Sequence, residues 1–513
     1  MLRNILTIGG WTFASRVLGF ARDMLIAATL GAGPLADAFF IALRLPNLFR
    51  RLFGEGAFNA AFVPAFTGTL TLQGPRQARE LAERMSTLMT LWLSLLVGLG
   101  MIFMPQVMSV LTPGLVDEPA RFDMVVELSR ITFPYLLFIC LTALVSGVLN
   151  AIDKFALAAG APLLFNLFAI VSLFALTPFV ATPANALAWG VMLSGIAQLA
   201  LVVVACRRAG MGFRIISWPR ITPETRKVLR SMVPGVLGAS VTQMSLAIDV
   251  FIASLLPVGA ISYLTYADRV AQLPLGVVGA AVGTALLPVL SRQLRGGKPL
   301  SAHRSMNRCV ELSLALTLPA AAALMVLAEP IVLTLFQRGA LSVEAAGAIS
   351  SALRAYAFGL PAFVLIKAFS PGFFARGDTA TPVKIGIAVV AVNLALSLGL
   401  TYFLDHVGIA LATALAAWCN AGLLFLLLRR RGHWLADRRL RRNLWRLGAA
   451  ALGMAAGLWL ALPVLFPLFG AGGGLPRLLG MGLLVGLGLA IYFGATQLLG
   501  ALRLQDLRRP RRA

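Results

Sequence analysis

The sequence predicts an all-α, polytopic membrane protein with about fourteen transmembrane helices. Of its 513 residues, 59% are hydrophobic and only 12% are charged, whereas about 25% of a typical soluble protein is charged. Many separate apolar runs are each long enough to cross a bilayer, which takes about 20 residues. Short basic loops separate these runs, so a helical bundle is expected rather than a barrel.

Fourteen apolar segments are expected to span the membrane. They cover about 5–30, 35–66, 85–108, 128–150, 157–180, 184–206, 231–256, 260–291, 306–328, 346–371, 383–404, 407–429, 445–468 and 476–500. The loops after even-numbered segments are basic, and those after odd-numbered segments are neutral or acidic. This pattern places both chain termini in the cytoplasm.

Recurring motifs predict an internal duplication. A-F-V-P-A-F at 61–66 resembles A-L-L-P-V-L at 285–290, an offset of 224, and Pro134 with Pro361 gives an offset of 227. We therefore expect two pseudo-symmetric six-helix lobes that both begin in the cytoplasm. Transporters built from such repeats place their binding sites between the repeats.

The predicted organisation has five parts. They are an N-terminal lobe (1–206), a cytoplasmic linker with an interfacial helix (207–230), a C-terminal lobe (231–431), two further helices (432–500) and a basic cytoplasmic tail (501–513). The two further helices are expected either to line a groove for a lipid tail or to be peripheral. The tail is expected to lie against anionic lipid.

The net charge of +24 does not indicate a nucleic-acid partner, because the basic residues collect in short loops between apolar segments. The four cysteines and three histidines are scattered without ligand spacing, so neither a disulfide framework nor a metal cluster is expected. Membrane lipids are the expected surroundings.

The first segment contains a stripe of charges in S-R-V-L-G-F-A-R-D at 15–23. Arg16, Arg22 and Asp23 fall on one face of a helix. A charge at the bilayer centre costs from about 2.5 to more than about 10 kcal/mol, so these side chains must face a polar interior. The stripe predicts a cavity that binds an anion. The alternative is a charge cluster that holds helices together.

The second segment is expected to break at Pro46, within L-R-L-P-N-L-F-R-R at 43–51. Non-helical backbone at this depth lines protein or water. Arg50 is therefore expected to face the cavity, whereas Arg51 fits the cavity and a cytoplasmic helix end equally well. Asp37 lies near the outer end of this segment.

The eighth segment repeats the theme in T-Y-A-D-R-V-A-Q at 265–272. Asp268, Arg269 and Gln272 share one helix face, and we expect them to face the same cavity as the arginines of the first segment. The alternative is a self-neutralising pair with a structural role.

A cation site is a further candidate. Asp249 lies inside the seventh segment, and Asn393 and Ser397 lie one turn apart in the eleventh. Buried oxygen ligands of this kind suit Na⁺ or a proton relay. A buried aspartate that is hydrogen-bonded to its neighbours explains the same residues.

Long motifs carry a family resemblance. The stretches S-R-V-L-G-F-A-R-D, A-D-A-F-F, L-P-N-L-F-R-R-L-F-G-E-G-A-F-N-A-A-F-V-P and A-R-G-D-T-A-T-P-V-K resemble the MurJ/MviN family, within the multidrug, oligosaccharidyl-lipid and polysaccharide exporters. The resemblance covers essentially the whole chain. It implies a flippase, not an enzyme, that moves lipid II, the undecaprenyl-diphosphate-linked peptidoglycan precursor, to the outer leaflet of the bacterial inner membrane by alternating access. The cell-wall synthesis machinery is an implied partner.

The resemblance also implies functional residues. The substrate-binding positions of the family correspond to Arg16, Arg22, Asp23, Asp37, Arg50, Asp268, Arg269 and Gln272. Some relatives have Glu at the position of Gln272. The sodium site of some members corresponds to Asp249, Asn393, Ser397, Ile409 and Thr413, and Ser397 replaces an aspartate of that site. Sodium or the membrane potential is the implied driver, and no other cofactor is expected.

Physical chemistry supports a diphosphate ligand, because guanidinium groups bind phosphate oxygens in a bidentate manner. The same architecture suits export of another polyprenyl-diphosphate-linked glycan. A cationic drug would need an acidic cavity, and a transferase for polyprenyl phosphates would need an acidic metal-binding motif such as D-D-x-x-D, which the sequence lacks. A scaffold without transport activity is a third alternative.

Overall fold

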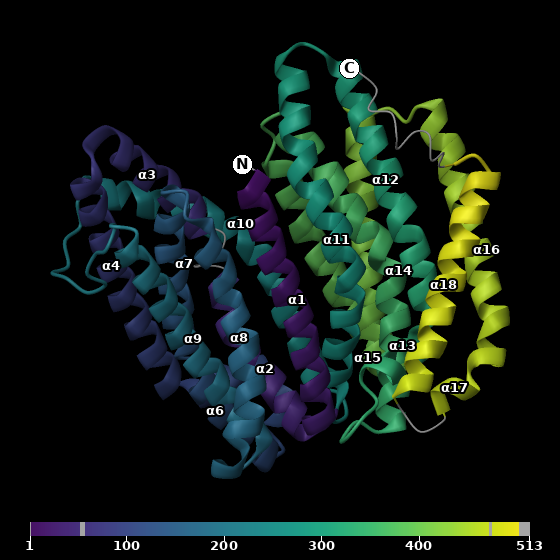
Figure 1. Ribbon diagram of the computed structural model, residues 1–513, viewed down its shortest axis with the longest axis horizontal. Helices are drawn as coiled ribbons and strands as arrows, with labels where there is room; N and C mark the ends of the chain where they lie inside the picture. The colour runs from purple at the N-terminus through teal and green to yellow at the C-terminus, as the bar shows by residue number, and fades with distance from the viewer. Residues whose placement is uncertain (1, 52–56, 471–473, 502–513) are drawn as a thin grey trace. The chain divides into compact units, whose positions relative to one another are not determined.

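The computed structural model describes residues 2–51, 57–470 and 474–501, and the regular structure of these residues is helical throughout (Figure 1). The α-helices are α1 (Leu2–Leu30), α2 (Pro34–Phe49), α3 (Ala57–Gln73), α4 (Pro75–Ile102), α5 (Met104–Leu111), α6 (Pro119–Thr132), α7 (Tyr135–Ala151), α8 (Phe155–Ala175), α9 (Pro183–Arg208), α10 (Pro223–Ser254), α11 (Ala260–Arg295), α12 (Pro299–Val326), α13 (Ala328–Leu335), α14 (Val343–Phe374), α15 (Ala380–Arg430), α16 (Arg438–Leu465), α17 (Pro467–Gly470) and α18 (Leu475–Leu498). Two short 3₁₀ helices, η2 (Pro113–Leu115) and η3 (Thr177–Phe179), complete the set.

The helices are those of a multi-pass membrane protein. Within the described part of the chain, nine helical segments are long and apolar enough to cross a membrane. The described residues of the fourteen predicted segments lie mostly on helix, although several segments are divided. The eleventh and twelfth are the two arms of α15, which turns at Asp405, where φ is 47°. The count of fourteen crossings and the orientation stay predictions.

The chain forms two compact units, Met1–Ser262 and Tyr263–Ala513. The division falls after Ser262 and not in the linker at 207–230, because α10 packs on α3, α4 and α5 of the first unit.

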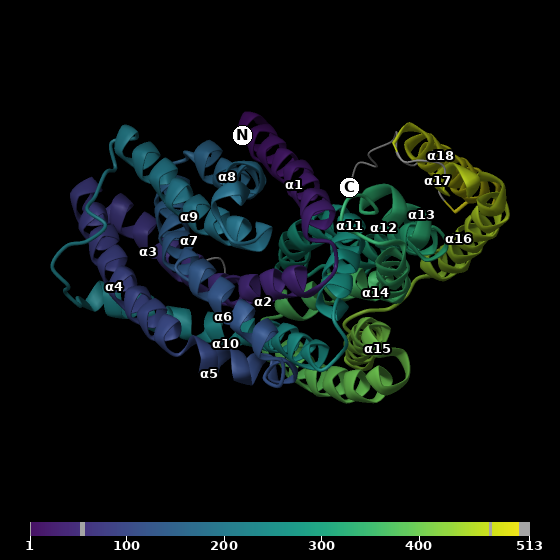
Figure 2. The ribbon, with the colours of Figure 1, turned by 90° about the horizontal axis from the view of Figure 1, so that it is seen from below.

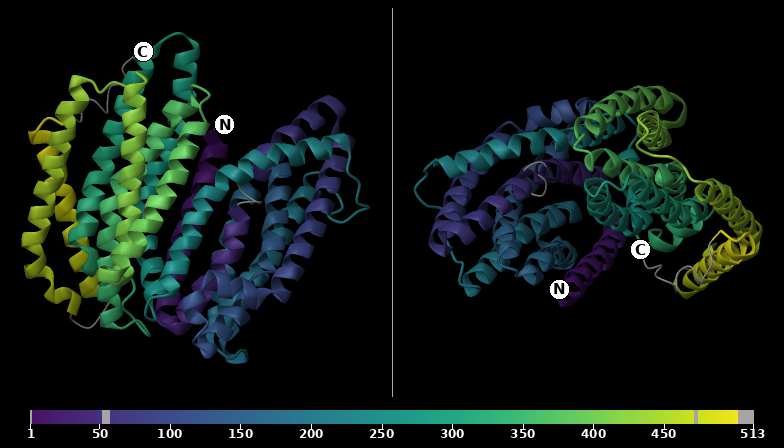
Figure 3. Two further views of the ribbon diagram at one scale, coloured as in Figure 1. Left: turned by 180° about the vertical axis from the view of Figure 1, so that it is seen from behind. Right: turned by 90° about the horizontal axis from the view of Figure 1, so that it is seen from above.

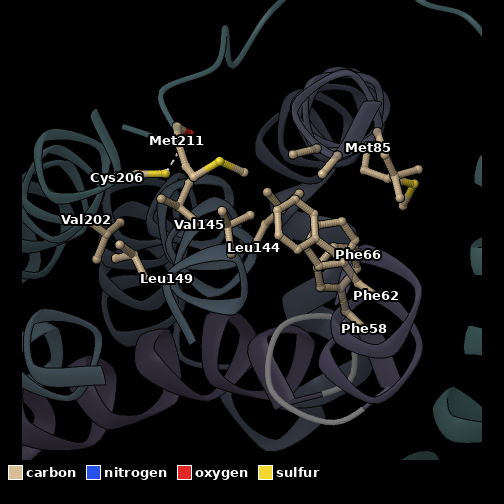
Figure 4. Packing of buried hydrophobic residues seen from close by; sticks show 14 of the residues in the cluster. Phe58, Phe62, Phe66, Met85, Leu144, Val145, Leu149, Val202, Cys206 and Met211 are labelled. Carbon is tan, nitrogen blue, oxygen red and sulfur yellow. Dashed lines mark hydrogen bonds between the residues drawn. The ribbon is translucent and has the colours of Figure 1, made fainter. Parts of the chain in front are cut away.

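The core of the first unit is built around α3. Phe58, Phe62 and Phe66 are spaced four residues apart, so their rings lie on one face of the helix, and Phe58 and Phe62 stack with ring centroids 5.0 Å apart. Figure 4 shows these rings beside Met85 of α4 and Leu144 of α7. Burial of these side chains stabilises the bundle, because it removes apolar surface from water and packs the side chains closely.

The predicted duplication is visible in the lengths of the helices. The helices α4 and α12 each contain 28 residues, α5 and α13 each contain 8, and the first and last residues of both pairs differ in number by 224. Core positions repeat with the same offset, since Phe62 and Phe66 in the first core correspond to Leu286 and Leu290 in the second. We call α1–α9 the first copy and α10–α15 the second copy.

The predicted break at Pro46 is wrong. Pro46 lies inside α2, which continues to Phe49 before a wider π turn at Arg50 and Arg51. Because proline has no N–H, the carbonyl of Ala42 one turn earlier loses its partner within the helix. Oγ1 of Thr132 on α6 donates to this carbonyl at 3.0 Å, and such a replacement allows a membrane helix to tolerate proline. The residues that follow, 52–56, lie outside the described part.

The linker also differs from its prediction. Residues 211–222 are not helical, and the helix expected there is the first two turns of α10, continuous with the seventh segment. Gly210, with φ of 75°, ends α9, and Pro219 removes a backbone donor from the stretch that follows. The linker runs beside α4 in Figure 2.

The last helices belong to the second unit. The helices α16 and α18 lie side by side (Figure 3), and α16 packs on α12. Glu311 of α12 is buried and accepts hydrogen bonds from Arg439, at 3.4 Å, and from Asn443, at 2.6 Å, on α16. Arg308 forms a third contact, an ion pair, with Glu311. The lipid-tail groove of these helices stays a prediction.

Candidate functional site

The centre of the candidate site is the charge stripe on α1. Arg22 donates from Nε and Nη2 to Oδ1 of Asp23, at 3.0 and 2.6 Å. The two side chains are only 11% and 9% exposed. An adjacent carboxylate and guanidinium therefore form a nearly buried ion pair, as expected of charges on a membrane helix.

The neighbouring helix α8 supplies the next partner. Nη1 of Arg22 donates to Oδ1 of Asn166 at 2.8 Å, and Nδ2 of Asn166 donates to the carbonyl of Ser15 at 2.9 Å. The guanidinium carbon also lies 5.2 Å from the ring centroid of Phe165, a cation–π distance. Gly19 leaves room for this contact, because a Cβ there would lie 3.3 Å from Nδ2 of Asn166, which is tighter than most side-chain contacts.

Asn166 was missed by the sequence reasoning. It is the sole amide side chain in the apolar stretch 155–175, and a polar group in such a stretch is a sign of function or of a specific partner. Its hydrogen bond to Nη1 orients the guanidinium of Arg22 against α8.

The cluster retains capacity to bind an anion. Arginine has five N–H groups, and the three hydrogen bonds to Asp23 and Asn166 use three of them. Arg16, about two turns earlier on α1, is exposed. The local charge is therefore a neutral Arg22–Asp23 pair with a further cation on the same helix.

The structure does not bring Asp37 into this cluster. Asp37 is 3% exposed, and its carboxylate accepts from the Gly259 N–H at 2.7 Å and from the Ser262 N–H at 2.8 Å. Arg121 lies 3.9 Å from the same carboxylate. Asp37 thus caps the start of α11 from α2, a structural role that the sequence reasoning missed. Its assignment as a substrate ligand stays a prediction.

Arg50 lies just after the end of α2, in the π turn. It is half-buried, and its Nε donates to Oδ1 of Asn47 at 3.3 Å. This hydrogen bond is local to the end of the helix. The predicted position of Arg50 in a substrate cavity stays a prediction.

The predicted residues of α11 lie in the second unit. Gln272 donates to the Asp268 carboxylate one turn earlier, and Arg269 is exposed. The amide of Gln272 is thus oriented by the aspartate on the same face of α11. The meeting of Arg269 with the α1 arginines stays a prediction.

The candidate cation ligands fit in part. Asn393 and Ser397 are buried on α15, and Oγ of Ser397 has no hydrogen-bond partner among the described residues. An unpaired buried hydroxyl suits an oxygen-coordinated cation. Thr413 donates to the carbonyl of Ile409 at 2.9 Å, and Asp249 lies on α10 of the first unit. Across 2–51, 57–470 and 474–501, no group of three His, Cys, Asp or Glu side chains forms a metal site.

Comparison with solved structures shows which proteins share this fold. The chain resembles an inward-facing MATE multidrug transporter of the MOP superfamily, with a TM-score of 0.68 and 14% identity, over 81% of this chain and 94% of that one. The two chains therefore share a fold.

Closer relatives define the family. The family model described as lipid II flippase MurJ matches residues 26–479. A probable lipid II flippase MurJ of Rhizobium meliloti is 46% identical over 92% of this chain and 89% of that protein. The lipid II flippase MurJ of Burkholderia cenocepacia is 37% identical over 84% of each. An inward closed MurJ structure has a TM-score of 0.79 and 23% identity, over 98% of this chain and 99% of that one. The chain belongs to the MurJ family.

Proposed function

We propose that this chain is a transporter, not an enzyme, that flips lipid II from the cytoplasmic to the outer leaflet of a bacterial inner membrane. Membership of the MurJ family supports the activity. The observation that carries the binding role is Arg22, a nearly buried guanidinium on a membrane helix that Asp23 and Asn166 hold in place.

The headgroup of lipid II contains a diphosphate, which is a compact anion. Two N–H groups of Arg22 are available to its oxygens, and charge-assisted hydrogen bonds of this type are the strong ones. Asp23 keeps the resting site close to neutral, so the site does not accumulate charge before substrate arrives. The side chains of Arg16, Arg50 and Arg269 are proposed to add contacts as the lobes alternate in access.

The energy source is proposed to be sodium or the membrane potential. The sodium ligands would be Asp249, Asn393, Ser397 and Thr413. The orphan hydroxyl of Ser397 supports this assignment. A membrane potential acts on every charge that moves through the field, at about 2.3 kcal/mol per charge per 100 mV.

The test is an assay of leaflet distribution in a bacterium depleted of its own lipid II flippase. Expression of this chain is expected to restore lipid II to the outer leaflet, where an added headgroup-modifying enzyme reaches it. Accumulation of lipid II in the inner leaflet despite folded protein in the membrane would refute the proposal. Restoration of a different polyprenyl-diphosphate-linked glycan, but not lipid II, would identify the alternative substrate.

A further inference from the structure

The linker between α9 and α10 is clipped to α4. Oγ of Ser86 donates to the carbonyl of Ile215 at 2.9 Å, and the Ser217 N–H donates to Oγ1 of Thr87 at 3.0 Å. Ser86 and Thr87 are fully buried. These hydrogen bonds hold the linker backbone at residues 215–217 against α4.

This clip lies where α4 changes character. The first ten residues of α4, 75–84, carry five charged side chains, and residues 88–102 carry none. A membrane helix leaves the hydrocarbon where its charges begin. The linker is thus held at the level of the interface between lipid and water.

Apolar side chains of the linker point away from the protein. Ile216, Trp218 and Ile221 are 66%, 77% and 63% exposed. Met211 and Val228, by contrast, are buried in the core of the first unit (Figure 4 shows Met211). An exposed Trp between two exposed Ile side chains at this level is typical of insertion into the headgroup region.

Basic side chains surround these apolar residues. Residues 209–231 contain five basic residues and one acidic residue, Glu224. Arg226, Lys227 and Arg230 are exposed and line a hollow of about 610 Å³ together with Ile221 and Thr222. Thr225 and Val228 occupy the opposite face of the same turns and are buried.

The start of α10 is already satisfied by its own side chains. The Thr222 N–H donates to Oγ1 of Thr225 at 2.8 Å, and the Thr225 N–H points back to Oγ1 of Thr222, a capping box. A ligand in the hollow therefore meets the three cationic side chains, and these match the charge of a phosphate.

We propose that residues 211–231, which comprise the linker and the first turns of α10, form a binding site for an anionic phospholipid of the cytoplasmic leaflet. Arg226, Lys227 and Arg230 bind the phosphate of its headgroup, and Ile216, Trp218 and Ile221 lie beside the upper acyl chains. The cytoplasmic leaflet is assigned from the basic loops of the sequence. The site uses none of the residues proposed to bind lipid II, so it stands apart from the proposed function.

The test uses the purified full-length chain in detergent and native mass spectrometry, with added dioleoylphosphatidylglycerol or dioleoylphosphatidylcholine. The variant is Arg226→Gln/Lys227→Gln/Arg230→Gln. The matched control is Arg438→Gln/Arg441→Gln/Arg442→Gln, which removes the same charge from exposed positions of α16. Thermal unfolding verifies that each variant is folded.

The wild type and the α16 variant are expected to retain phosphatidylglycerol over phosphatidylcholine, and the linker variant is expected to bind phosphatidylglycerol at least fivefold more weakly. Trp218→Ala is expected to weaken it as well, by about twofold to threefold, because the indole contributes apolar contact. Wild-type binding by the linker variant, or equal losses in both charge variants, would overturn the proposal. Equal binding of glycerophosphoglycerol, which has no acyl chains, would also overturn it, because the apolar side chains would then have no role.

Discussion

The two copies of the repeat agree in their core and differ in their charges. The helices α1 and α10 end at Leu30 and Ser254, which share the offset of 224, so Arg22 and Asp23 in the first copy correspond to Leu246 and Ala247 in the second. The helix α10 therefore forms without an ion pair at these two positions. The scaffold therefore does not require the pair, which supports the proposal that Arg22 and Asp23 serve a ligand.

A second pair of positions shows how one structural task is solved in two ways. Thr87 and Glu311 are related by the same offset of 224. Each contacts the segment that follows its copy, which is the linker for Thr87 and the start of α16 for Glu311. Oγ1 of Thr87 accepts a neutral hydrogen bond from the Ser217 N–H. Glu311 instead forms an ionic cluster with Arg308, Arg439 and Asn443. Here both copies carry a polar side chain that contacts the segment that follows, so these polar groups are structural.

The largest expected effect comes from giving the first copy the residues of the second. Arg22→Leu/Asp23→Ala is expected to lower flipping by about 100-fold, because two charge-assisted hydrogen bonds to the diphosphate are worth about 3 kcal/mol. Thermal unfolding should stay near the wild-type value, since Leu and Ala occupy these positions in α10. The leaflet assay is the measurement. Arg130→Leu is the control, because Arg130 is exposed on α6 and donates to the backbone carbonyl of Met101. Flipping at the wild-type rate by Arg22→Leu/Asp23→Ala would show that the charge difference between the two copies does not matter for transport.

The next effect concerns the ionic cluster. Glu311→Thr, which introduces the residue of the first copy, is expected to lower the free energy of unfolding by about 3 kcal/mol, because it removes the carboxylate that two arginines share. This loss lies at the lower end of the cost of breaking a buried ion pair, because the side chains of Arg308 and Arg439 are 38% and 36% exposed. Thr87→Val should cost only about 1 kcal/mol. Unfolding in detergent measures both, and a larger loss for Thr87→Val would contradict the assignment.

Asp37 is expected to affect stability more than binding. Asp37→Asn replaces one acceptor by a donor that faces the N–H groups of Gly259 or Ser262, at a cost of about 2 kcal/mol. Affinity for lipid II should change by less than about twofold. Asp123→Asn, at an exposed position of α6, is the control. A loss of affinity with unchanged stability would instead make Asp37 a substrate ligand.

The hydrogen bond from Arg22 to Asn166 provides a test of how Arg22 is positioned. The counterpart of Asn166 in the second copy is Val390. Asn166→Val is expected to weaken lipid II binding by about threefold to tenfold, because Arg22 loses one neutral partner worth about 1 kcal/mol and with it a fixed orientation. Isothermal titration measures this change. The exposed Asn150→Val serves as its control, and an equal effect of both would remove the positioning role.

The smallest effect is a pH dependence at the turn between α14 and α15. Hydrogen bonds from Thr381, and then the one from Arg431 at 2.6 Å, lower the pKa of Asp378 to about 2. A lowered pKa stabilises the fold above the unfolded value of about 3.9 and loses this contribution as the pH falls to about 2. The unfolding temperature of Asp378→Asn should therefore lie slightly below that of the wild type at neutral pH, with the gap closing between about pH 4 and about pH 2. A gap that does not depend on pH would contradict the pKa assignment.

The sequence predicted what depends on local pattern. Hydropathy located the helices, and the A-F-V-P-A-F motif gave the offset that the helix ends and core positions share. The charge stripe on α1 drew attention to Arg22 and Asp23, whose side chains are nearly buried, and their role in binding stays a prediction.

Contacts between distant segments could not be read in this way. Asn166 is far from Arg22 along the chain, and Ser262 is far from Asp37, yet each pair is joined by a hydrogen bond. A helical pattern gives the face of a residue but not its partner on another helix. Likewise, Pro46 is a local signal for a break, but the hydrogen bond from Thr132 to the carbonyl that this proline frees comes from another helix and allows α2 to continue.

The most direct measurement is the equilibrium affinity of the purified full-length protein for lipid II, compared between the wild type, Arg22→Leu/Asp23→Ala and Arg130→Leu. A guanidinium that binds the diphosphate predicts that the α1 variant binds at least about 30-fold more weakly, while Arg130→Leu stays within about twofold of the wild type. Equal affinity of all three folded proteins would contradict the role of the α1 cluster in substrate binding.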